Sequence, residues 1–155
     1  MYKSKEDPKH YTTIEQSKKL LELGLNPESA DMTYDAITEG VRERMIIKDW
    51  QANIGLDIAI KENRFSYRNG YVVPCWSLGA LLEVMPIIKK GIDEYLPYFI
   101  KGSEIWKGEI QSFWYCSYAL LDDSNTELIT FRNSTAVEAA YNMVVWLLEN
   151  NYIKK

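Results

Sequence analysis

The sequence is short of the residues from which most catalytic and metal sites are built. Among its 155 residues it has one histidine, His10, and two cysteines, Cys75 and Cys116. A Ser-His-Asp triad or a histidine-rich metal site would depend on His10 alone, which lies in a charged segment. Two cysteines are too few for a disulfide scaffold, and such a count is typical of a reducing compartment. We expect no catalytic site and no metal site.

Phosphate-binding glycine motifs and long hydrophobic runs are also missing. The eight glycines form neither a GxGxxG turn nor a P-loop. The first ten residues lack the apolar segment of a secretory signal. The longest apolar run of the last predicted helix, Met143 to Leu148, is far below the ~20 residues that span a bilayer. We therefore expect a cytoplasmic protein that binds no cofactor and does not enter a membrane.

The chain has no excess of positive charge. It carries 18 Lys and Arg residues against 22 Asp and Glu residues, a net charge of −4. This balance does not favour nucleic acid or an anionic membrane as a partner. Hydrophobic residues make up 46% and aromatic residues 13% of the chain, which excludes a disordered protein. The length suits a flexible tail over residues 1–10 and one domain over residues 11–155.

The last helix has the best-defined pattern. Thr135 followed by Glu138 is a capping box, which predicts where the helix begins. Apolar residues then recur at steps of three and four and predict one buried face: Val137, Ala140, Tyr141, Val144, Leu147 and Leu148. Val145 and Trp146 lie outside this stripe. The helix is therefore expected either to be buried against two elements, which we favour, or to offer an apolar patch to a second molecule.

Two more helices have recognisable ends. Overlapping capping boxes at residues 12–15 and 13–16 predict a helix that stops at Gly24, where a left-handed residue ends the helix. Within residues 74–86, Ser77 predicts the start of a short helix, and Trp76 is expected to pack on its first turns.

Strand patterns fill much of the remaining chain. Residues 110–121 predict a long central strand, with alternate apolar residues on both faces: Trp114, Cys116, Tyr118 and Leu120 on one, and Phe113, Tyr115 and Ala119 on the other. Residues 122–125 predict a turn and residues 126–131 the partner strand. Residues 54–60 alternate like a strand. Residues 87–108 indicate an irregular connection, briefly helical around residues 92–95, because Pro97, Gly102 and Gly108 interrupt them.

A basic and aromatic segment, residues 64–71, predicts a hairpin. Asn69-Gly70 suits the two positive-φ positions of a type I′ turn. Arg64, Arg68 and Tyr71 are candidate contacts to single-stranded nucleic acid, which stacks on aromatic rings and binds cations. The period of a strand instead directs the arginines to solvent and the intervening aromatic residues to the core. Nucleic-acid binding is therefore an alternative rather than the leading interpretation.

These elements together predict an α+β fold. A single domain would contain an antiparallel sheet built from hairpins, covered on one side by the N-terminal, the short central and the C-terminal helices.

Cys75 is the one residue that suggests covalent chemistry. It lies just before the Ser77 cap, and a helix N-terminus lowers the pKa of a nearby thiol. No partner base accompanies it, so a cysteine-dependent enzyme is the least favoured alternative. A small buried apolar side chain is the interpretation that we prefer for Cys75 and for Cys116.

Three blocks carry a resemblance: residues 12–27 (TTIEQSKKLLELGLNP), residues 74–86 (PCWSLGALLEVMP) and residues 135–152 (TAVEAAYNMVVWLLENNY). In this order they resemble small uncharacterised proteins of gut Bacteroidales genomes, their prophages and phages. Thr135 stands where those proteins often have the helix cap, and Glu138 where they have an acidic residue. The resemblance implies a phage or mobile-element origin and no particular activity.

The leading hypothesis is a small cytoplasmic, non-enzymatic protein-binding or accessory module of phage or mobile-element origin. Its expected partner is another protein or a second copy, in a homodimer that uses aromatic surface such as Trp146 or Tyr152. The sequence identifies no small-molecule ligand.

Overall fold

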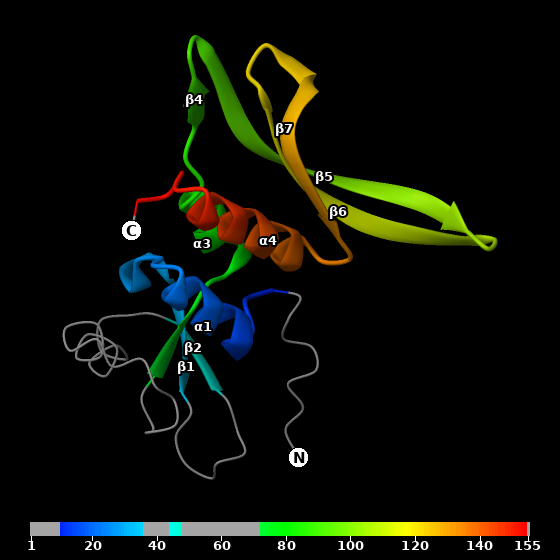
Figure 1. Cartoon of the computed structure of the whole chain (residues 1–155). Helices are drawn as coiled ribbons and strands as arrows, with labels where there is room; N and C mark the ends of the chain where they lie inside the picture. The colour runs from blue at the N-terminus through cyan, green and yellow to red at the C-terminus, as the bar shows by residue number, and fades with distance from the viewer. Residues whose placement is uncertain (1–9, 36–43, 48–71, 155) are drawn as a thin grey trace.

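The computed structural model describes residues 10–35, 44–47 and 72–154 (Figure 1). Its fold is α+β, as the sequence predicts. The described elements are α1 (Ile14–Glu22), the 3-10 helix η2 (Pro27–Ser29), β1 (Met32–Asp35), β2 (Arg44–Ile47), β3 (Val72–Cys75), α3 (Leu78–Glu83), β4 (Ile88–Lys90), β5 (Asp93–Trp106), β6 (Glu109–Leu120), β7 (Asp123–Asn133) and α4 (Ala136–Glu149).

The larger sheet is antiparallel, with strand order β4-β5-β6-β7. Helix α4 covers one of its faces and packs against β6 and β7 (Figure 1). Cys116 and Tyr118 of β6 are fully buried beneath this helix, together with Leu147 of α4. The alternation predicted for β6 is confirmed, because these residues point to the helix and their neighbours to the opposite face.

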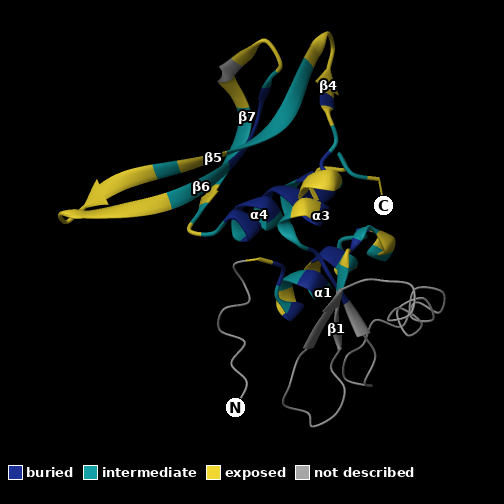
Figure 2. Cartoon of the chain, turned by 180° about the vertical axis from the view of Figure 1, so that it is seen from behind, coloured by how far each residue is buried: buried dark blue, intermediate teal, exposed yellow. Residues whose placement is uncertain are grey.

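Helix α4 begins where the sequence predicts. The Thr135 hydroxyl accepts a hydrogen bond from the Glu138 N–H at 3.2 Å. The helix packs not only on the sheet but also on α3 and α1, and Figure 2 shows its buried surface between them. Val145 and Trp146 are half-buried as a result. The favoured prediction, burial against more than one element, is confirmed.

Of the two capping boxes offered for α1, Thr13 with Gln16 is the one that forms. Thr12 is instead buried, where its hydroxyl accepts a hydrogen bond from the Trp76 N–H at 3.1 Å and bonds the Ser17 hydroxyl at 2.8 Å. Thr12 thus connects α1, through Ser17, to Trp76, which lies just before α3. At the other end Gly24 has a φ of 97°, which ends the helix as predicted.

Helix α3 also begins as predicted. The Ser77 hydroxyl accepts a hydrogen bond from the Ala80 N–H at 3.2 Å and donates one to the Asp31 carboxylate. Trp76 and Leu81 are both fully buried in the main core, and the Trp76 ring nitrogen donates to the Ser29 hydroxyl at 2.9 Å. This short helix therefore closes the core between α4 and η2.

A second antiparallel sheet, of order β2-β1-β3, lies below α1 in Figure 1. The sequence did not assign strands to 32–35 or 44–47, where apolar and charged residues are mixed. The strand expected at 54–60, the hairpin turn at Asn69-Gly70 and residues 1–9 of the expected tail lie outside the described residues.

The irregular connection expected over residues 87–108 is wrong. These residues form β4 and the 14-residue strand β5. Pro97 is tolerated because β4 pairs with β5 only as far as Tyr95, so the chain at Pro97 has a neighbouring strand on one side alone. Gly102 is covered by the Tyr115 ring, and Gly108 lies in the turn after the strand. None of the three interrupts the strand.

Candidate functional site

The two cysteines occupy positions unsuited to nucleophilic chemistry. Both are completely buried. The Cys75 thiol donates a hydrogen bond to the Thr12 carbonyl at 3.4 Å, and burial raises the pKa of the Cys116 thiol to about 12. The Cys116 thiol therefore stays protonated at neutral pH, and both buried cysteines act as small apolar side chains. In the described part of the chain, no three His, Cys, Asp or Glu residues are grouped as metal ligands.

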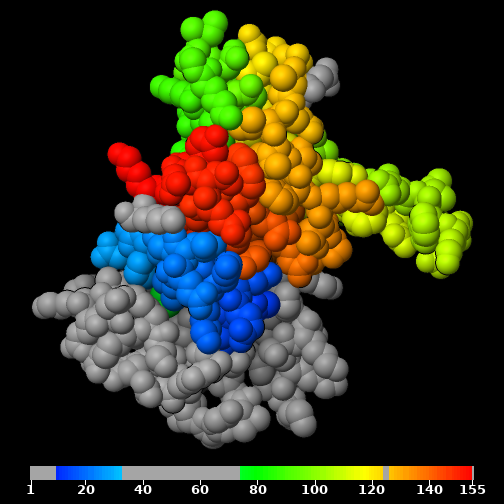
Figure 3. Space-filling view, in the orientation of Figure 1, coloured from blue at the N-terminus to red at the C-terminus, as the bar shows by residue number. Residues whose placement is uncertain are grey.

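A projecting arm is the most prominent feature of the surface. We define the arm as residues 101–114, the outer halves of β5 and β6. Strand β7 pairs with β6 only from Leu120 back to Trp114, opposite Asn133, so beyond this point the described sheet has two strands. Figures 1 and 3 show the arm extending well away from the helices. From Lys101 to Trp106 the arm is about 17 Å long at ~3.4 Å per residue.

The end of the arm is apolar. We call Ile105, Trp106 and Ile110 the tip; their exposed fractions are 78%, 61% and 76%. Lys107 and Gly108 connect the strands with φ values of 51° and 80°, as a type I′ turn requires. Ile105 and Ile110 are directly opposed and share one face of the hairpin, whereas Trp106 lies opposite Glu109 on the other face. Large apolar side chains this exposed gain little from the core, which makes the tip a candidate surface for interaction.

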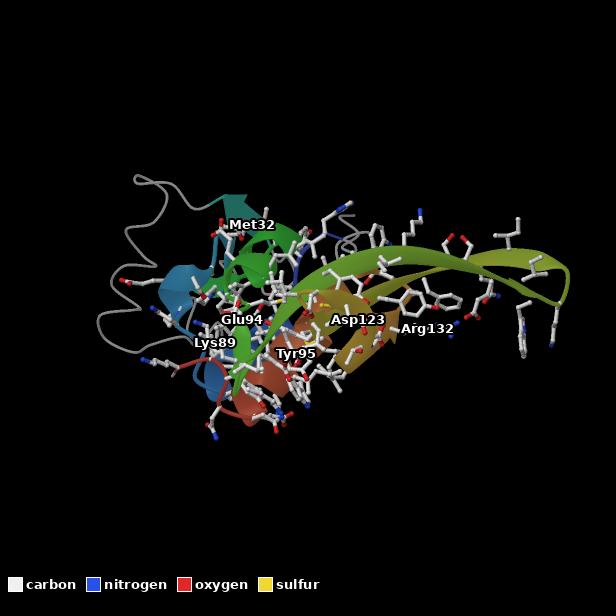
Figure 4. All side chains as sticks on the ribbon, turned by 90° about the horizontal axis from the view of Figure 1, so that it is seen from above. Met32, Lys89, Glu94, Tyr95, Asp123 and Arg132 are labelled. Carbon is white, nitrogen blue, oxygen red and sulfur yellow. The ribbon has the colours of Figure 1, made fainter. Side chains whose placement is uncertain are left out.

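The root of the arm is held by contacts on the sheet face opposite to α4. Arg132 of β7 forms an ion pair with Glu104 at 2.7 Å, and its guanidinium lies 3.7 Å from the centre of the Phe113 ring. Figure 4 shows Arg132 at the base of the arm. The Tyr115 ring lies over Gly102 on the same face. Because a two-stranded hairpin is marginal alone, these contacts are what hold the arm at a defined angle.

A hollow of about 470 Å³ lies on the other face of the root, between the arm and the start of α4. Its lining residues are His10, Leu78, Lys101, Ser112, Trp114, Ser134, Thr135 and Ala136. Lys101 extends over the Trp114 ring, with the ammonium nitrogen 5.7 Å from the ring centre. Among the described residues, no carboxylate or thiol lines the hollow, so these residues supply neither an acid–base pair of carboxylates nor a cysteine nucleophile.

Two of the residues that the sequence selected, Trp146 and Tyr152, lie away from the arm and the hollow. Trp146 and Tyr152 stack on each other at 5.3 Å between ring centres and pack, half-buried, against the core. Lys90 covers the Tyr152 ring at 5.9 Å. Arg64, Arg68 and Tyr71 lie outside the described residues, so their role in nucleic-acid binding stays a prediction.

No protein-family model, curated protein or solved structure matches this chain. The resemblance to phage and Bacteroidales proteins therefore stays a prediction. None of the described helices combines the length and apolarity that crossing a bilayer requires.

The arm was missed in the sequence although a signal for it exists. The pair Lys107-Gly108 lies just before the segment that is predicted to be a long strand, and glycine suits a positive-φ turn position. Lysine is an uncommon residue at the other position, which is why the turn was not recognised.

Proposed function

We propose that this protein is a small, cytoplasmic, non-enzymatic module of phage or mobile-element origin that binds a protein partner through the tip of its arm. The observation that carries the proposal is the exposure of Ile105, Trp106 and Ile110 at the end of a hairpin that leaves the body of the molecule. Tryptophan is enriched among the residues that dominate binding energy at protein interfaces.

The chemistry of the arm supports a protein partner rather than a nucleic acid. Between the tip residues lie one positive residue, Lys107, and one negative residue, Glu109, so the end of the arm offers no positive stripe for phosphates. Burial of the two cysteines and a hollow whose described lining holds no carboxylate also favour binding over catalysis.

Affinity capture from a lysate of the host tests the proposal. The tagged protein is compared with the triple variant Ile105→Thr, Trp106→Thr, Ile110→Thr, in which threonine preserves strand propensity while removing apolar surface. We expect a discrete nuclease-resistant protein with the wild type and at least a tenfold smaller recovery with the variant.

The matched control is the double variant Ile92→Thr, Leu121→Thr. These residues are 99% and 66% exposed in the turns at the opposite end of the sheet. The control is expected to recover the partner as the wild type does. Equal recovery by the tip variant would refute the arm as the binding surface, and recovery that disappears with nuclease would favour the nucleic-acid alternative.

A further inference from the structure

The outer edge of β5 has no described neighbour along most of its length. Strand β4 pairs with Asp93, Glu94 and Tyr95, and no described strand adjoins β5 on that side from Leu96 to Trp106. An open edge presents unpaired backbone N–H and C=O groups that accept another strand. Figure 3 shows the outer part of the hairpin projecting clear of the described body.

The sequence of this edge is complementary to itself. Two antiparallel copies related by a twofold axis place residues of the same sheet face opposite each other. With the axis at Ser103, Ile100 of one copy faces Trp106 of the other, and Lys101 faces Ile105. Ile100 is 50% exposed and Trp106 is 61% exposed, so this register covers apolar surface on both copies.

Charges are also compatible with this register. Glu104 of one copy faces Gly102 of the other, and each Glu104 is already neutralised by Arg132 at 2.7 Å. No like-charged residues face each other across the seam, where such pairs would be destabilising. Pro97, which lacks an N–H, lies beyond the end of the paired segment.

The exposed area limits the size of the contact. Ile100, Ile105 and Trp106 expose roughly 400 Å² per copy if a large side chain presents about 150–250 Å² when free. Both copies and their backbone edges together can bury at most about 1,000 Å², the lower size of a specific interface. We therefore expect a weak, reversible dimer, to be sought at concentrations up to about 100 µM.

We propose that the partner of the arm is a second copy of this chain, which pairs with the β5 edge antiparallel about Ser103. The inference rests on the proposed function, since it names the occupant of the arm. The four-stranded sheet of one copy then joins the four-stranded sheet of the other into one continuous sheet across the twofold axis.

Engineered crosslinking tests the register. Opposed residues in antiparallel strands have Cα atoms about 4.5–5.5 Å apart, a distance that a disulfide spans. Ser103→Cys is expected to form a covalent dimer with the mild thiol oxidant diamide, whereas Ser112→Cys is not. Ser112 is the matched control because it pairs with Ser103 within the chain and is also exposed, but lies on β6. The natural cysteines are buried.

Sedimentation velocity of the uncrosslinked protein provides the second measurement. Ser103→Asp places two carboxylates face to face at the axis and is expected to weaken dimerisation at least tenfold, while Ser112→Asp changes it less than twofold. A wild type that stays monomeric at 100 µM would overturn the inference, as would equal crosslinking of Ser103→Cys and Ser112→Cys.

The two proposals fail separately. If the protein is monomeric and a different protein is captured in a tip-dependent manner, the arm keeps its function and the second copy is excluded. If capture does not depend on the tip, and no dimer forms, both proposals are wrong.

Discussion

At the scale of single residues, the arm depends on a glycine that the sequence pattern treats as a break. A Cβ atom on Gly102 would lie 2.7 Å from a carbon of the Tyr115 ring, closer than such atoms approach in proteins. The ring therefore occupies the space that any other residue would fill. Glycine is favoured at position 102 because of Tyr115, which is 13 residues away in the sequence and lies on the neighbouring strand β6.

Gly102→Ala is expected to lower the free energy of unfolding by about 1 kcal/mol, because the Tyr115 ring must move from its place on the strand. In the background Tyr115→Thr the same substitution is expected to be neutral or to stabilise by roughly 0.5 kcal/mol, since alanine restricts the unfolded chain. Urea unfolding of the four proteins measures this coupling. Equal losses in both backgrounds would show that the ring does not determine the requirement.

At the scale of elements, β5 and β6 are the two longest described strands, with 14 and 12 residues, but their sequence signals are unequal. Strand β6 has apolar residues on both faces and was predicted within one residue of its observed ends. Strand β5 contains Pro97 and Gly102, whose local preferences oppose a strand. Its pairing with β6 along the whole strand outweighs these preferences, and that pairing is invisible to a local pattern.

Arg132→Gln is expected to loosen the arm without unfolding the body. Because the ion-pair side chains are 41% and 47% exposed, its loss costs less than about 1 kcal/mol of global stability. Loss of the Phe113 contact adds to the local effect. We expect amide hydrogen exchange at residues 103–112 to be roughly 3- to 10-fold faster.

Lys89→Gln is the control for this measurement. It removes the Lys89–Glu94 contact at 3.9 Å, which lies at the opposite end of β5. Amide hydrogen exchange at residues 103–112 of this variant should then match that of the wild type. If both variants accelerate the arm equally, Arg132 has no particular role in holding it.

At the scale of the whole molecule, β6 brings polar groups into the main core. The Tyr118 hydroxyl donates a hydrogen bond to the Pro86 carbonyl at 2.7 Å, which satisfies it and ties the sheet to the chain after α3. Cys116 lies beside it under α4, where burial raises the pKa of the thiol from its ordinary value of 9.0 to about 12. The packing of the sheet on α4 is therefore sensitive to alkaline pH.

The sign of this effect follows from the two pKa values. Above pH 9 the unfolded chain loses the Cys116 proton while the folded chain keeps it, so the stability is complete below pH 9 and decreases as the pH rises toward 12. Between pH 9.5 and 11, the free energy of unfolding of the wild type should fall up to about 1.4 kcal/mol per pH unit more steeply than that of Cys116→Ala. Urea unfolding at each pH measures the slopes, and parallel slopes would contradict the prediction.

The sequence by itself determined the three α-helices and the starts of α3 and α4, and it limited the start of α1 to Thr12 or Thr13, because a cap is formed by residues two or three apart. Thr13, Ser77 and Thr135 each accept the hydrogen bond that their local pattern predicts. It also determined the α+β class and the two faces of β6, since alternation and helical period are local properties.

Only the tertiary structure decided which part of the chain projects from the core as the arm. The arm exists because β7 ends opposite Trp114 while β5 and β6 continue, and this depends on the register of three strands. The same packing covers Trp146 and Tyr152 and exposes Ile105 and Trp106, although all four are large apolar or aromatic residues. Exposure depends on which elements pack together, so hydrophobicity in the sequence does not distinguish a core residue from a contact residue.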